Sequence, residues 1–448
     1  MSLLKQPNLR VAFALLAGLL SAVPAMAATT ESEAQRRYQA AFNAVVADAA
    51  NPERSFELVQ AAVAAGEFRA AIAALERILL INPTLSNIKL ELGVLYLRAG
   101  SPDLAVSYID QALNDPNMPP LVRTRAEELL NRAKAGAKRQ SFFATLGLAI
   151  RTESNANAGP DSPFVRVGGT IGQLADQFTG RSDTSLNLSA ALQHRYAFGS
   201  QFGHQLETDL YLFGSRYQDI KDVETTLAEL RIGPRFYVGP VGNPNSSLRP
   251  YLLSSHLQLA GEKYNSGFGA GLDAERYFTG AFRGDVALEY RDQDYHDSVR
   301  SPTATNRIGK FTGGSVGLAY QPTSRTTLGA RLLHEQASAK AEFEAYKTTG
   351  ATVFVAQEFN APFGVTPLPW NVVVSATARN TSFDAPDPAI DPNIKRDDDR
   401  MDYGISLRAR VTRTSDVVFA VQLSDRDSNL PNFVYDNSGV SLGGEWRF

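Results

Sequence analysis

Residues 142–448 alternate polar and apolar side chains with a period of two, in one segment after another. In one segment, Leu186 and Leu188 fall on one face, while Asn187 and Ser189 fall on the other. Successive side chains of a β-strand point to opposite faces of a sheet, so each segment is predicted to be a strand. The segments run to about ten residues or more, the length that a tilted strand needs to cross a bilayer. The pattern therefore predicts a closed antiparallel transmembrane β-barrel, apolar toward lipid and polar toward its lumen.

We expect fourteen strands, an even number that returns the carboxy terminus to the side where the first strand begins. Connections after odd-numbered strands should be long and extracellular, and those after even-numbered strands short and periplasmic. The approximate strand ranges are 142–152, 184–196, 204–216, 224–237, 248–260, 264–278, 281–295, 310–321, 325–338, 344–358, 369–383, 399–411, 415–427 and 433–448.

The amino terminus has the pattern of a secretory signal peptide over residues 1–27. Lys5 and Arg10 lead into an apolar stretch, which ends at a small-residue Ala-Met-Ala cleavage site before Ala28. No later segment is apolar enough to span a membrane as a helix, so membrane residence requires the barrel. A signal peptide followed by a barrel predicts the outer membrane of a diderm bacterium, with outer-membrane lipid as a partner.

Composition excludes several kinds of site. The chain has no cysteine and a net charge of −3, which excludes disulfides and thiolate metal sites and argues against nucleic acid as a partner. Only five histidines are present, and no Gly-x-Ser-x-Gly elbow occurs. We therefore expect no enzymatic activity, no cofactor and no metal. The three aspartates at 397–399 are compatible with a cation site, but hydration of a loop end explains them better.

Residues 28–139 follow a different pattern, rich in Ala, Leu, Glu and Arg, and are predicted to form a helical domain. A repeat with a period of about 34 residues matches the tetratricopeptide pattern, in which small residues let paired helices approach and bulky ones fill the grooves. An unrelated helical bundle is the alternative. Because this domain precedes the first strand, it should lie in the periplasm. The predicted packing positions are Gly66, Ala71, Pro83, Leu92, Gly93, Tyr96, Gly100, Ala105 and Ala112.

The last strand, within residues 140–448 of the predicted barrel domain, ends the chain on an aromatic residue. Trp446 and Phe448 share its lipid face and are predicted to be the signal that the barrel assembly machinery recognises. Aromatic residues near other strand ends, among them Tyr251 and Tyr295, are predicted to form girdles at the level of the lipid headgroups.

The polar faces of the strands predict the composition of the lumen wall. Acidic and basic residues are nearly balanced there, which suits a hydrated or protein-filled passage better than an anion-selective pore. The residues that we expect to meet a passing substrate are Glu207, Asp209, Glu229, Arg231, Arg235, Glu289, Arg291, Arg331, Arg408 and Arg410.

The run from Leu146 to Asn157, Leu-Gly-Leu-Ala-Ile-Arg-Thr-Glu-Ser-Asn-Ala-Asn, ends in a motif that resembles one of the surface lipoprotein assembly modifiers, the Slam proteins. That family has an Asp-Ser-Asn-Val-Asn type of motif, so Glu153 and Ala156 depart from it. The resemblance implies a periplasmic tetratricopeptide domain, a fourteen-stranded barrel, and the movement of a client lipoprotein or related secreted protein to the cell surface. Export of an exopolysaccharide and a general solute channel remain alternatives. The long loop at 153–183 could also fold inward as a plug or serve as a receptor.

Overall fold

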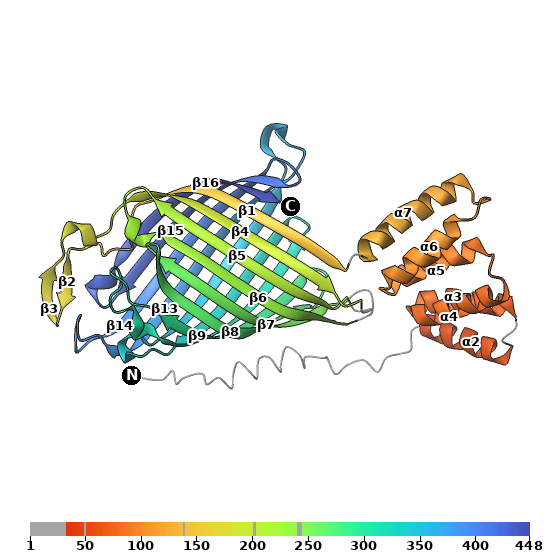
Figure 1. The fold of residues 1–448 in the computed structure, drawn as a ribbon, viewed down its shortest axis with the longest axis horizontal. Helices are drawn as coiled ribbons and strands as arrows, with labels where there is room; N and C mark the ends of the chain where they lie inside the picture. The colour runs from red at the N-terminus through yellow and green to blue at the C-terminus, as the bar shows by residue number, and fades with distance from the viewer. Residues whose placement is uncertain (1–32, 49–50, 138, 200–202, 240–243) are drawn as a thin grey trace. The chain divides into compact units, whose positions relative to one another are not determined.

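The computed structural model describes residues 33–48, 51–137, 139–199, 203–239 and 244–448. Helices form the amino-terminal part of the chain, and a closed β-barrel forms the rest (Figure 1). This confirms the prediction of separate helical and barrel parts. The predicted signal peptide, residues 1–27, lies outside the described residues.

The helices of the amino-terminal part form antiparallel pairs. Gly66 joins α3 to α4 and Gly100 joins α5 to α6, with φ angles of +79° and +72° that glycine adopts without strain. Among the described residues, no helix combines the length and the apolar character needed to cross a membrane. The helices are α2 (Glu33–Ala47), α3 (Pro52–Ala65), α4 (Phe68–Ile81), α5 (Ser86–Arg98), α6 (Pro102–Leu113) and α7 (Pro120–Ala137).

The core of the helical part depends on small residues between α5 and α6. A Cβ added at Gly93 would lie only 2.3 Å from Cγ1 of Ile109, so the two helices can approach this closely only with glycine at that position. Other predicted packing positions are also fully buried, whereas Pro83 lies in the exposed turn between α4 and α5. The buried ones are Ala71, Leu92, Ala105 and Ala112.

Two tyrosines link the pairs of helices. The rings of Tyr96 and Tyr108 stack with their centroids 5.4 Å apart, and their hydroxyls donate hydrogen bonds of 2.6 and 3.2 Å to the carboxylate of Glu76 on α4. Burial, together with the nearby Glu76 carboxylate, raises the pKa of both Tyr96 and Tyr108. Both phenols therefore stay protonated and can donate to Glu76.

Fourteen consecutive antiparallel strands close the barrel in the order β1-β16-β15 and so on to β5-β4, so that β1 lies between β16 and β4. A separate hairpin, β2 (Phe164–Val167) with β3 (Thr170–Gln173), lies in the connection between β1 and β4. The barrel strands are β1 (Gln140–Glu153), β4 (Asp183–Ala197), β5 (Gln205–Tyr217), β6 (Thr225–Val238), β7 (Ser246–Leu259), β8 (Glu262–Tyr277), β9 (Phe282–Tyr295), β10 (Gly309–Thr323), β11 (Thr326–Ala337), β12 (Tyr346–Phe359), β13 (Trp370–Pro386), β14 (Lys395–Arg410), β15 (Ser415–Ser428) and β16 (Tyr435–Arg447).

The first and last strands pair along a continuous seam. Register runs from Thr145 opposite Arg447 to Glu153 opposite Gly439. Phe448 extends the pairing, because its N–H donates to the Ala144 carbonyl at 2.9 Å and its carbonyl accepts from the Ala144 N–H at 3.1 Å. Pairing along this seam satisfies backbone groups that would otherwise face hydrocarbon.

Connection lengths follow the predicted asymmetry only in part. After the even-numbered strand β12, residues 360–369 form a connection longer than several of those after odd-numbered strands. After odd-numbered strands, the connections β1–β4 and β9–β10 are long, but β7 and β8 are joined by Ala260 and Gly261 alone, with φ angles of +52° and +80°. Two positive φ angles in succession are typical of a tight type I′ hairpin. The expectation that every such connection is long is therefore wrong at this position.

Replacing Gly443 by valine should strain the β1–β16 seam. A Cβ there would lie 2.4 Å from the Leu148 carbonyl oxygen and 2.7 Å from Cβ of Ala149. Overpacking of this kind costs about 1–3 kcal/mol, so we expect a lower urea midpoint for protein refolded in vesicles. Gly214→Val is the control, since nothing lies within 4 Å of the added Cβ. An equal loss in both variants would contradict a specific role of the seam.

Candidate functional site

Most of the residues predicted for the lumen form one ionic network on the inner wall over β5, β6 and β9. At its centre Glu207, only 3% exposed, accepts from Nε of Arg235 at 2.8 Å and lies 3.2 Å from Nε of Arg249. Arg249 also contacts Asp209 at 2.6 Å. Two carboxylates and two guanidiniums therefore compensate one another where water is largely excluded.

The same network continues over β6 and β9. Arg231 pairs with Glu229 at 2.8 Å and with Glu289 at 3.5 Å. Arg291 pairs with the same two carboxylates at 3.1 and 2.6 Å. These four side chains form a closed square of opposite charges, which fixes their rotamers along the wall.

Tyr251 lies inside the barrel, not in the girdle predicted for it. Tyr251 is only 4% exposed. The guanidiniums of Arg231 and Arg249 lie over its ring, at 5.2 and 5.6 Å from the ring centroid. Gly271 opposite makes room, because a Cβ there would lie 2.2 Å from the ring. The alternation pattern is weak in this strand, because the stretch Leu-Arg-Pro-Tyr-Leu-Leu has apolar residues on both faces and a single charged one, Arg249. For the same reason Arg249 was not predicted.

Tyr295, also predicted for a girdle, has the inward parity of Glu289 and Arg291 on β9. Its ring packs edge-on against Tyr264, with centroids 5.5 Å apart. These two corrections mean that the inner wall contains aromatic rings as well as charges.

The remaining predicted lumen residues form two smaller clusters. Arg331 on β11 pairs with Asp285 at 2.5 Å and donates to the hydroxyl of Ser315 at 2.8 Å. Arg408 and Arg410 on β14 lie 3.3 and 3.5 Å from the carboxylate of Asp416.

Asp416 is the centre of the second of these clusters and is 2% exposed. Arg447 on β16 contacts it at 3.0 Å, and Arg408 also pairs with Glu445 at 2.5 Å. Three arginines thus surround two carboxylates where β14, β15 and β16 lie side by side, near the carboxy terminus. This cluster therefore has a local excess of positive charge.

At the opposite end of the same strands, Asp398 is 2% exposed and pairs with both Arg396, at 2.9 Å, and Arg426. The guanidinium of Arg396 lies between the rings of Phe383 and Phe433, at 4.4 and 3.3 Å from their centroids. The interpretation of residues 397–399 as hydration of a loop end is therefore wrong for Asp398, because β14 begins at Lys395 and alternation turns this carboxylate inward.

The motif at the end of β1 organises the long connection that follows it. The side chain of Asn155 donates to the Gly159 carbonyl at 2.8 Å and accepts from the Gly159 N–H at 3.0 Å. Asn157 bonds in the same way to the Thr179 carbonyl and the Arg181 N–H, each at 2.8 Å. Glu153, just before them, accepts from Asn437 of β16 at 3.0 Å. The motif therefore clamps both ends of the loop to the seam.

The loop does not enter the lumen. Figure 1 shows the β2–β3 hairpin beyond the ends of the barrel strands. Arg166 of the hairpin pairs with the buried Asp391 at 2.7 Å, and its backbone N–H and carbonyl bond to the side chain of Asn432, each at 3.0 Å. The hairpin is thus fixed against the connections β13–β14 and β15–β16, which does not favour a plug.

The described residues contain no group of three or more His, Asp or Glu side chains placed to hold a metal ion. The arrangement instead offers a wall of fixed, mutually paired charges and hydroxyls along the inner surface of the barrel. Such a wall can hydrate and guide a polar or polypeptide substrate.

Glu207→Gln should destabilise the barrel strongly. Removing one partner of a buried ion pair costs about 3–5 kcal/mol, because Arg235 and Arg249 would then share too little negative charge. Asp222→Asn is the matched control: it breaks a half-exposed pair with Arg300, worth about 0–1 kcal/mol. The free energy of unfolding in urea should fall for the first variant and stay nearly constant for the second. If the ionic network contributed nothing to stability, the free energy of unfolding would be the same in both variants.

Comparison with known proteins supports this architecture. A tetratricopeptide repeat profile matches residues 62–126, and no curated protein matches the chain. Similar solved structures include a bacterial polysaccharide outer membrane secretin (12% identity, TM-score 0.37, covering 68% of this chain and 98% of that one) and the outer membrane channel DcaP of Acinetobacter baumannii (9%, 0.39, 69% and 97%). These TM-scores are too low to carry an argument. The profile of the surface lipoprotein assembly modifiers matches residues 144–448, and the chain belongs to that family of outer-membrane proteins.

Proposed function

We propose that this protein moves a lipoprotein, or a related secreted protein, across the outer membrane to the cell surface. The observation that carries the proposal is the family match over the whole barrel, on a chain that also contains tetratricopeptide repeats. Repeats of this kind present an extended surface that suits capture of a protein segment. The helical part would receive the client in the periplasm, and the barrel would provide or gate the route.

The chemistry of the inner wall is compatible with a polypeptide client. Balanced pairs such as Arg331 with Asp285 leave little net field, so neither acidic nor basic segments would be rejected outright. A wall of ionic and hydroxyl groups also has few apolar surfaces to which an unfolded polypeptide could adsorb. Transfer would draw on client folding or on handover from carrier proteins, since the sequence contains no nucleotide-binding motif.

Two aromatic rings argue against a sugar track: Tyr251 on the inner wall and Phe433 in the β15–β16 connection. Tyr251 is buried beneath Arg231 and Arg249, and Phe433 is covered by Arg396. A carbohydrate chain would need open aromatic faces along its path, which these two rings do not offer.

The test is comparative surface proteomics of a strain with the wild-type gene, a deletion strain and a strain that carries Gly93→Val. Valine at this position would collide with Ile109, so the repeats should unfold while the barrel still assembles. We expect the same surface lipoproteins or secreted proteins to be lost in the deletion and in Gly93→Val.

Glu91→Val is the matched control, because it introduces the same side chain on an exposed face of the same helix, α5. It should keep the client at the surface. If surface proteins are unchanged in the deletion strain while uptake of small solutes or export of polysaccharide falls, the proposal is wrong.

A further inference from the structure

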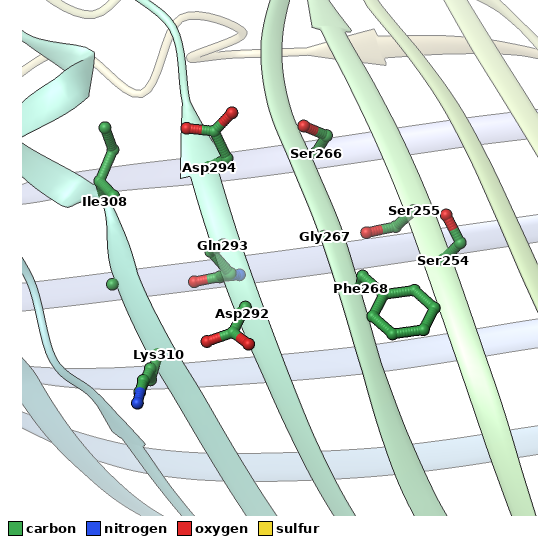
Figure 2. Close-up of a pocket in the computed structure, with 11 residues that line it drawn as sticks. Ser254, Ser255, Ser266, Gly267, Phe268, Asp292, Gln293, Asp294, Ile308 and Lys310 are labelled. Atoms are coloured by element: carbon green, nitrogen blue, oxygen red, sulfur yellow. The ribbon is translucent and has the colours of Figure 1, made fainter.

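A row of outward-facing side chains crosses four adjacent strands of the barrel at one level. Ser254 on β7 is opposite Phe268 on β8, Phe268 is opposite Asp292 on β9, and Asp292 is opposite Lys310 on β10. Ser266 and Asp294 add a second level next to this row. Together they line a groove of about 590 Å³ on the wall (Figure 2).

Alternation places this groove on the outside of the barrel. Phe268 in the row is 62% exposed. Ser255 directly follows Ser254, and Arg291 directly precedes Asp292. These two neighbours of the row bond to each other within the lumen network. Four residues of inward parity also line the groove, so the backbone between the outward side chains forms part of its floor. They are Ser255, Gly267, Gln293 and Gly309. The groove is therefore separate from the passage described above.

The groove lies where the lipid-facing wall changes from apolar to polar. Two residues below the row, Leu252 on β7 and Tyr290 on β9 are exposed, apolar or aromatic, and point outward. Above the row are the connections that belong to the long-loop, extracellular end. This is the level of the lipid headgroups in the outer leaflet.

The outward polar side chains of the groove have few partners or none within the protein. Among the described residues, the ammonium of Lys310 and the hydroxyls of Ser254 and Ser266 have no hydrogen-bond or ion-pair partner. The carboxylate of Asp292 accepts a single side-chain bond, from the hydroxyl of Tyr290 at 3.1 Å. Asp294 makes only a 3.5 Å contact with His296.

A similar level on another part of the outer wall is different. Asp397 and Asp399 on β14 both accept hydrogen bonds from Asn380, at 2.9 and 3.0 Å, and Asp397 also accepts from Ser382 at 2.7 Å. The outward carboxylates on β14 thus accept several hydrogen bonds from neighbouring side chains of the barrel, whereas Asp292 and Asp294 in the groove have at most one contact each. The open donors and acceptors require water or a ligand.

We propose that this groove binds the saccharide headgroup of a glycolipid in the outer leaflet. The exposed ring of Phe268 offers an apolar platform for one face of a sugar ring. The carboxylates of Asp292 and Asp294 accept from sugar hydroxyls, and Lys310 donates to a hydroxyl or a phosphate on the sugar. A volume of about 590 Å³ falls within the usual range of about 300–1,000 Å³ for ligand pockets.

The apolar wall below the groove selects a lipid over a free sugar. Acyl chains attached to the headgroup would lie along outward side chains such as Leu252 and Tyr290. A soluble saccharide gains nothing from that surface, and a phospholipid with a small headgroup fills little of the groove and leaves Phe268 uncovered. Binding should therefore need both the sugar and the acyl chains.

Native mass spectrometry of the purified full chain in detergent tests the proposal with three probes: lipid A (an acylated, phosphorylated glucosamine disaccharide), phosphatidylglycerol and the deacylated disaccharide. We expect lipid A to bind at least about tenfold more tightly than either other probe. The double variant Phe268→Ala/Lys310→Gln should weaken lipid A binding by about tenfold or more.

The matched control is Leu332→Ala/Lys395→Gln, which alters one exposed apolar residue and one exposed lysine of the barrel outside the groove. It should bind lipid A as the wild type does. If the groove variant still binds lipid A as the wild type does, the proposal is wrong. It is also wrong if the wild type binds lipid A and phosphatidylglycerol equally, because the bound molecule is then an adventitious lipid only. Equal binding of the deacylated disaccharide overturns the assignment to a lipid. Heat-modifiable migration of both variants confirms that their barrels are folded.

Discussion

A bilayer offers no water to a backbone N–H or carbonyl, and this constraint determines most of what the structure contains. Each strand must pair on both sides, so the sheet has to close on itself. Closure is completed between β1 and β16, where pairing continues as far as Phe448 and Ala144. Small residues such as Gly443 allow these two strands to approach without a collision on the inner face.

Closure divides side chains between two environments, and the inner one is built from compensated charge. Glu207 and Arg249 are almost as buried as core residues, yet each meets an opposite charge within 3.2 Å. Tyr251 lies beneath two guanidiniums, and Asp398 holds two arginines at the other end of the barrel. The interior is consequently rigid along its wall and polar toward its axis. This combination suits a passage whose surface neither adsorbs nor strongly sorts a polypeptide.

Much of the fold could be predicted from the period-two pattern, because register is strongly specified when one face must be apolar. Strand bounds differ most at β14, which begins at Lys395, since its first residues are all charged and carry no alternation. Prediction failed where both faces carry apolar residues, as around Tyr251, and where backbone conformation decides, as at Ala260 and Gly261. Ionic partners such as Arg249 with Glu207 could not be derived, because pairing across strands depends on register between segments.

If the protein exports a client as proposed above, the inner face of the barrel, not its lipid face, should meet that client. Arg331 and Leu332 are consecutive on β11 and point to opposite sides: Arg331 pairs with Asp285 in the lumen, and Leu332 is 65% exposed on the outer wall. A photo-crosslinking amino acid placed at each position in turn, in cells that export the client, tests the claim directly. The account predicts a covalent adduct with the client from position 331 and none from position 332. An adduct from position 332 alone, or equal adducts from both, would contradict it.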